Sequence, residues 1–137
     1  MIDEATVGPP RRWDGALGID FQLERPSSDT AVLTVCGEID MLTAPALLQA
    51  GRAALEQAQR LLILDLAAVS FIGASGLATL LRLRDAVACR GAELRLARSS
   101  DVVLRCLSAL RLTALFNLHD GPPEPATNAP PKLELIR

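Results

Sequence analysis

A serine between small residues stands where an apolar run gives way to a helical pattern, in the stretch Gly73-Ala74-Ser75-Gly76. Such a serine can be a catalytic nucleophile, a phosphate acceptor or a helix N-cap. The nucleophile elbow of hydrolases needs G-x-S-x-G, but Leu77 stands where the second glycine belongs. The triad base would have to be His119, the only histidine, at the edge of a proline-rich stretch. We predict no catalytic residue and keep a serine hydrolase as the contrasting hypothesis.

Phosphate chemistry is the second possibility for this turn. The phosphate-binding motifs G-x-x-x-x-G-K-[ST] and G-x-G-x-x-G are both absent from the sequence. A helix that begins near Ser75 would still offer free backbone N–H groups and the positive end of its dipole to an attached phosphate. The simpler interpretation is that Ser75 caps the helix while Gly73 and Gly76 permit the turn. The residues alone leave both interpretations open.

Other classes of function find little support in the sequence. Glu38 and Asp40 lie close together, but no His or Cys joins them at ligand spacing, so we predict no metal and no cofactor. A net charge of −2 and an aromatic content of 3% argue against nucleic-acid binding. No apolar run reaches the ~18 residues that span a bilayer, and residues 1–18 lack the apolar core of a signal peptide. We therefore expect a cytoplasmic protein without nucleic-acid or membrane partners.

Strand and helix patterns alternate through the middle of the chain. Period-two and apolar runs predict strands at residues 19–25, 31–36, 61–66, 93–97 and 115–118, the first two forming a hairpin. Helical spacing predicts three helices: one capped by Thr43, one from near Ser75 to Gly91, and one capped by Ser99 or Ser100. This order predicts an α/β fold with a mixed, mostly parallel sheet and helices packed mainly on one face.

The length of 137 residues favours one domain. Residues 1–17 lack a periodic pattern and predict a flexible N-terminal tail, whereas residues 18–120 form the domain. Residues 121–137 predict a Pro-rich C-terminal tail. Its last six residues, K-L-E-L-I-R, alternate like a short strand, so they are either a docking peptide or a disordered end. We expect the disordered end.

Three segments, in this order and spacing, resemble the STAS domain of bacterial anti-sigma-factor antagonists, and the likeness covers roughly residues 17–120. V-L-T-V-C-G-E-I-D-M-L-T-A-P-A-L, residues 32–47, is similar to the family's second strand with its G-E-[IL]-D and following Thr-Ala. L-I-L-D-L-A-A-V-S-F-I, residues 62–72, resembles the strand and loop ahead of the regulatory serine. S-G-L-A-T-L-L, residues 75–81, resembles the helix that follows.

The resemblance implies a STAS-like single domain that works as a switch and has no enzymatic activity. Antagonists of this type bind an anti-sigma factor that is also an ATP-dependent serine kinase, and so free a sigma factor for transcription. Phosphorylation of a serine at the start of the helix breaks the complex, and a phosphatase restores it. The resemblance also implies that Glu38, Asp40 and Thr43 flank the partner surface, together with the turn at residues 73–76.

The sequence departs from the family at its regulatory position. The family typically reads D-S-[ST]-G with the first serine phosphorylated, whereas this chain reads G-A-S-G, with Gly73 for the aspartate and Ala74 for the phosphoacceptor. Three hypotheses follow. The protein is an antagonist held in its binding state, or Ser75 has become the phosphate acceptor, or the domain is a passive scaffold in a signalling or transport complex. We favour the first, because alanine keeps the small shape of the unphosphorylated serine.

Overall fold

The structure is a computed structural model that describes residues 11–13 and 18–119. The elements in chain order are β1 (Arg11–Trp13), β2 (Ile19–Ser27), β3 (Thr30–Ile39), α2 (Ala44–Gln57), β4 (Leu61–Ile72), α3 (Ala74–Cys89), β5 (Glu93–Ala97), α4 (Asp101–Ala109), the 3₁₀ turn η1 (Thr113–Leu115) and β6 (Asn117–His119). The predicted alternation of strands and helices is confirmed from β2 onward.

The six strands form one sheet in chain order, from β1 at one edge to β6 at the other. The pairs β1–β2 and β2–β3 are antiparallel, and the pairs from β3 to β6 are parallel. The predicted mixed, mostly parallel sheet is therefore confirmed. Strand β1 was not predicted and falls within the stretch expected to be a tail. The predicted C-terminal tail, residues 121–137, lies outside the described residues.

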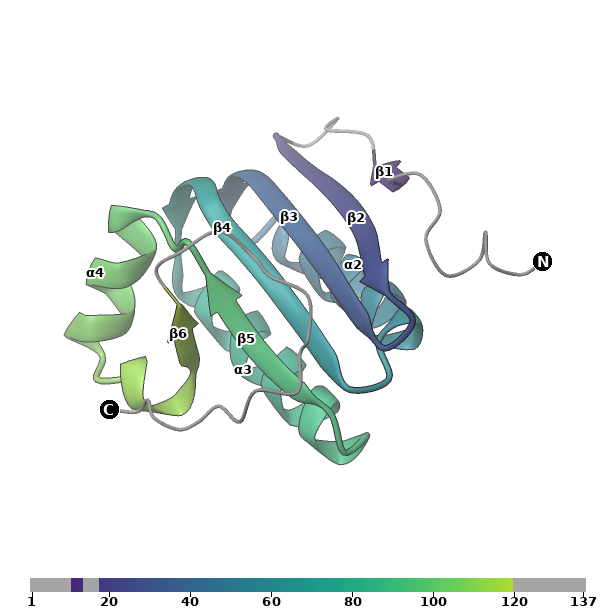
Figure 1. Cartoon of the computed structure of the whole chain (residues 1–137). Helices are drawn as coiled ribbons and strands as arrows, with labels where there is room; N and C mark the ends of the chain where they lie inside the picture. The colour runs from purple at the N-terminus through teal and green to yellow at the C-terminus, as the bar shows by residue number, and fades with distance from the viewer. Residues whose placement is uncertain (1–10, 14–17, 120–137) are drawn as a thin grey trace.

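Helices α2 and α3 pack against the same side of the sheet, which confirms the predicted one-sided arrangement (Figure 1). Strand residues that alternate toward this side form the main core with residues of the helices, among them Leu33, Leu64, Leu47, Leu80 and Leu83. Val103 and Leu107 of α4 join the same cluster. Burying each such aliphatic side chain stabilises the fold by roughly 1.5–3 kcal/mol.

The opposite side of the sheet carries a second, smaller cluster of buried side chains: Val32, Leu61, Ile63 and Ala97. Every residue from Leu61 to Leu66 is buried, because β4 faces the helices with one set of side chains and this second cluster with the other. We call the side of β3, β4 and β5 opposite α2 and α3 the helix-free face.

Strand β4 runs to Ile72, six residues beyond the predicted end. Its register against β3 shifts twice, between Thr34 and Cys36 and between Gly37 and Glu38. Each irregularity places an extra β4 residue opposite the β3 chain and disturbs the period-two pattern, so the extension A-A-V-S-F-I does not look like a strand. Because β4 is longer than predicted, only Gly73 separates its end from the start of α3.

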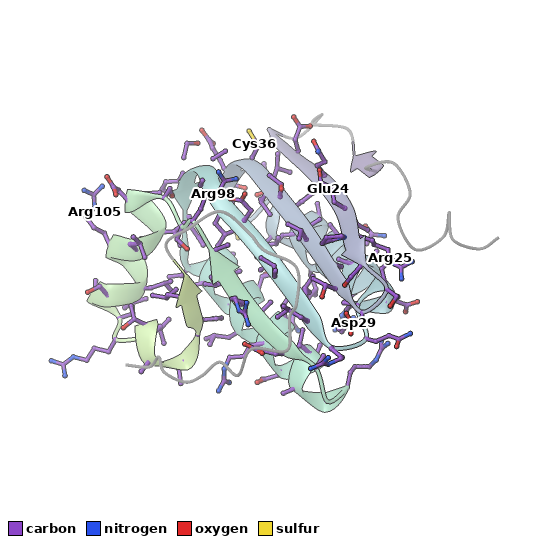
Figure 2. The ribbon with its side chains drawn as sticks, viewed as in Figure 1. Glu24, Arg25, Asp29, Cys36, Arg98 and Arg105 are labelled. Carbon is purple, nitrogen blue, oxygen red and sulfur yellow. The ribbon has the colours of Figure 1, made fainter. Side chains whose placement is uncertain are left out.

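The labelled side chains identify the two ends of the sheet (Figure 2). Arg25 and Asp29 lie at the end where β2 turns into β3, and Cys36 and Arg98 lie at the other end. At the turn, the Ser27 hydroxyl donates a hydrogen bond of 3.0 Å to Asp29 Oδ1, and this bond is the main cause of a lowered pKa for that carboxyl. The predicted site residues lie beyond the other end, where β3 and β4 stop.

Candidate functional site

Helix α3 begins with Ala74, directly after the N-cap residue Gly73. The backbone N–H of Gly73 donates to the carbonyl of Ile39 over 2.9 Å, which ties the helix start to the end of β3. Ala74 is exposed at the first helical position, and Ser75 is half-buried at the second. The predicted capping role of Ser75 is therefore wrong, because the residue lies inside the first turn and none of the described side chains caps α3.

Gly76 is required by packing and not by backbone conformation. A Cβ atom at this position would lie 2.5 Å from Ile39 Cγ2 and 2.8 Å from Ile72 Cγ1. The first turn of α3 thus packs against the ends of β3 and β4 at a distance that only glycine permits. Gly73 has φ −103°, which any residue can adopt. The expectation that both glycines serve to permit the turn is corrected accordingly.

The loop between β3 and α2 is held together by Asp40 and Thr43. Asp40 Oδ1 accepts hydrogen bonds from the backbone N–H groups of Leu42, at 2.9 Å, and Thr43, at 3.0 Å. The Thr43 hydroxyl accepts from the Asp40 N–H at 2.8 Å and donates to the Glu38 carbonyl at 2.8 Å. Thr43 is the N-cap residue by position, but its side chain bonds to the loop and makes no cap hydrogen bond to α2. Both side chains position this loop.

The loop displays two large apolar side chains that were not predicted as part of the site. Met41 is 78% exposed and Leu42 is 74% exposed. Phe71, near the end of β4, is 47% exposed, and its ring lies 3.4 Å from where a Cβ of Gly73 would stand. The sequence does show Met41 and Leu42 as an apolar pair between the polar residues Asp40 and Thr43. They lie in a loop, where no strand or helix periodicity predicts that they are buried. Met41 and Leu42 are adjacent in one loop, and exposed apolar side chains that lie together are typical of interaction surfaces.

A groove of ≈ 390 Å³ lies where the first turns of α2 and α3 meet. It is lined by Met41, Ala44, Pro45, Leu48, Ser75, Ala78, Thr79 and Arg82. The structure therefore brings together the two segments that the sequence singled out, the β3–α2 loop and the start of α3. We call Met41, Leu42, Phe71, Ala74 and Ser75 the docking surface.

The described residues offer neither a metal site nor a helix that could span a membrane. Within residues 11–13 and 18–119, no three His, Cys, Asp or Glu side chains form a group that could hold a metal ion. None of the described helices is long and apolar enough to cross a membrane. The features of the site are thus exposed apolar surface, a shallow groove and one exposed cation, Arg82.

Comparison with known proteins identifies the family to which this fold belongs. The family model of the STAS domain matches residues 21–123. The chain is similar to an anti-sigma factor antagonist from Mycobacterium paratuberculosis, with 28% identity and a TM-score of 0.68 over 80% of this chain and 92% of that chain. A search of curated proteins found no match.

Two further structures share the fold at lower identity. One is the anti-sigma factor antagonist SpoIIAA in its unphosphorylated form, at 20% identity and a TM-score of 0.61, covering 73% of this chain and 88% of that chain. The other is a sulfate transporter family protein from Wolinella succinogenes, at 20% identity and a TM-score of 0.58, covering 66% of this chain and 76% of that chain. The family match spans nearly all of the described residues and continues past them, and the chain belongs to the STAS domain family.

Proposed function

We propose that this protein is an anti-sigma-factor antagonist that acts by binding and not by catalysis. The similarity to the Mycobacterium paratuberculosis antagonist supports this role. The observation that carries the proposal is the exposed Ala74 at the start of α3, beside a loop that presents Met41 and Leu42. A methyl group stands where a phosphorylatable hydroxyl is expected, within a surface otherwise suited to docking.

The proposed partner is an anti-sigma factor with serine kinase activity. Met41 and Leu42 supply the apolar area, since a fully buried side chain of this size contributes roughly 1.5–3 kcal/mol. Arg82 at the groove offers a charge for an acidic group of the partner. Because Ala74 has no hydroxyl, the kinase has no acceptor at the usual position, so the antagonist stays in its binding state and the sigma factor stays free.

Phosphate at this surface would oppose binding through simple electrostatics. A phosphoserine carries a charge of about −1.5 to −2 at neutral pH, and burying it in an apolar interface costs desolvation energy. The first turn of α3 would stabilise such a group in the free protein through its N–H groups and dipole. Ser75 is the remaining hydroxyl in this turn, but it is half-buried in the groove and offers a kinase less access than the exposed position 74.

The test begins with affinity purification of the full chain from its native cell and identification of the captured kinase-type anti-sigma factor by mass spectrometry. The affinity of the purified pair is then measured with and without ATP and Mg²⁺. We expect the same affinity in both conditions. Met41→Asp with Leu42→Asp should weaken binding by at least about tenfold. Leu110→Asp is the matched control, because Leu110 is a 57% exposed apolar residue at the end of α4.

Ala74→Ser supplies the positive control for the switch. This variant should bind as the wild type does without ATP, gain one phosphate by intact mass with ATP, and then release the partner. Phosphate on the wild-type chain that disappears in Ser75→Ala would overturn the fixed binding state and make Ser75 the acceptor. Capture of transport components, with no affinity for an anti-sigma factor, would favour the scaffold hypothesis.

A further inference from the structure

The groove between the first turns of α2 and α3 has two helical walls. Both helices start where β3 and β4 stop, and both run back along parallel strands, so they point in the same direction (Figure 1). One wall consists of residues 41, 44, 45 and 48, and the other of residues 75, 78, 79 and 82. Each set has the i, i+3, i+4, i+7 spacing of one helix face. The groove therefore follows the helix axes over about 10 Å, the rise of seven helical residues.

The floor of the groove presents mainly apolar surface. Ala44 is 6% exposed and Thr79 is 5% exposed. The Thr79 hydroxyl donates a hydrogen bond of 2.9 Å to the Ser75 carbonyl, so its proton is already bound within α3. Pro45 and Ala78 add exposed apolar surface at the rim. An occupant with apolar side chains therefore fits the floor and the rim.

One end of the groove carries a positive charge. Among the described residues that line the groove, Arg82 alone is charged, and it is exposed. The ion pairs found among the described residues do not include it. Arg82 follows Ser75 by seven residues along α3, so it lies at the end of the groove away from the strand ends. A carboxylate of an occupant would complement the charge at this end.

The walls also favour one backbone conformation for the occupant. Beyond their terminal turns, the two helices use their backbone N–H and C=O groups internally and cannot pair with an added strand. An extended segment would leave its own backbone groups unpaired over apolar surface, at about 1–3 kcal/mol for each buried group. A helix satisfies its own backbone and places side chains at i, i+3, i+4 and i+7 into a groove of this kind.

We propose that the groove binds an amphipathic helix of the partner, with apolar side chains against Met41, Pro45 and Ala78 and an Asp or Glu beside Arg82. Because the groove is about two helical turns long, the acidic residue stands about seven residues from the apolar residue that contacts Met41. This inference rests on the proposed function, since the helix belongs to the anti-sigma factor. It adds the form and the chemistry of the segment that binds.

Filling the groove tests whether the partner uses it. Ala78→Trp should weaken binding of the purified anti-sigma factor by at least about tenfold, while Met41 and Leu42 remain in place. Ala88→Trp is the matched control, because Ala88 is exposed on the same helix outside the groove, and it should bind as the wild type does. Wild-type affinity in Ala78→Trp would overturn this inference and leave the proposed function standing. A wild-type chain without affinity for any anti-sigma factor would overturn both.

Charge reversal tests the acidic residue and works even if the tryptophan variant does not fold. A benzophenone amino acid in place of Ala78, in the full chain, crosslinks the bound segment for identification by mass spectrometry. Arg82→Glu should weaken binding about tenfold, and changing the acidic residue of that segment to Arg should restore it. Arg105→Glu is the control, since Arg105 is exposed on α4. Equal affinities of Arg82→Glu and Arg105→Glu would remove the charge contact.

The backbone of the bound segment is measured in the complex itself. With the partner labelled with ¹³C and bound to the full chain, the Cα shifts of the crosslinked segment should be helical. Shifts of an extended segment, or a crosslink to a second copy of this chain in place of the partner, would contradict the proposed helix.

Discussion

At the scale of single residues, Asp40 holds the shape of the docking surface without being one of its residues. Its Oδ1 atom holds the N–H groups of Leu42 and Thr43, and the loop it closes presents Met41 and Leu42 to solvent. The sequence resemblance placed Asp40 at the partner surface as a contact. The geometry instead favours a positioning role, which changes the expected effect of its substitution.

Substitution of Asp40 separates the two roles. Asp40→Asn keeps an acceptor oxygen for the loop and removes the charge, so partner affinity and stability should stay near those of the wild type. Asp40→Ala removes the acceptor and should cost about 1–3 kcal/mol of unfolding free energy, while also weakening binding as the loop loses its shape. Urea unfolding and partner affinity are the measurements. A loss of binding in Asp40→Asn at full stability would show a direct charge contact instead.

The sequence predicted that the G-A-S-G turn and the loop after β3 lie together, but it gave some of their residues the wrong structural role. The G-A-S-G turn and the Glu38–Thr43 loop were identified, and the structure brings them together through the Gly73–Ile39 hydrogen bond. The helix begins one residue earlier than expected, so Ser75 is not a cap. That shift follows from β4 running to Ile72, which leaves only Gly73 between strand and helix. Local propensity cannot show where a bulged strand stops.

At the scale of elements, the contact between α3 and the strand ends depends on Gly76. Gly76→Ala places a methyl group against Ile39 and Ile72, and overpacking of this kind costs typically 1–3 kcal/mol. The gain in helix propensity, about 1 kcal/mol, offsets only part of that cost. Gly73→Ala is the matched control, since its Cβ would meet Phe71 at an ordinary 3.4 Å. Denaturant unfolding should show a larger loss for Gly76→Ala, and equal losses would remove the packing argument.

Other elements follow closely from their local signals. Gly91 ends α3 with φ +74°, and the Ser100 hydroxyl accepts from the Val103 N–H at 3.4 Å as the cap of α4. Strand β1 was not predicted, because three residues are too few to show the alternation of a strand. Gly51 lets α2 approach Leu83 of α3, because a Cβ at this position would lie 2.6 Å from the Leu83 side chain. Sequence patterns showed which residues were small, whereas the tertiary neighbour came only from the fold.

At the scale of the whole molecule, the two surfaces of interest lie on different parts of the fold. The docking surface lies at and beyond the ends of β3 and β4, whereas the buried cluster of the helix-free face includes Leu61 and Ile63, near the start of β4. Distant sites without shared partners act additively, within roughly 0.3–0.5 kcal/mol. Substitutions in the docking surface and in the buried cluster of the helix-free face should therefore change the unfolding free energy additively.

The edges of the sheet bear on how the protein behaves at high concentration. Strands β1 and β6, one at each edge, contain three residues each. An edge strand exposes unpaired backbone groups that can recruit a strand from another molecule, and very short edges are one way in which natural sheets limit this. The long, apolar β4 lies in the interior of the sheet, paired on both sides. The strand most prone to aggregation is thus shielded from edge-to-edge assembly into fibrils.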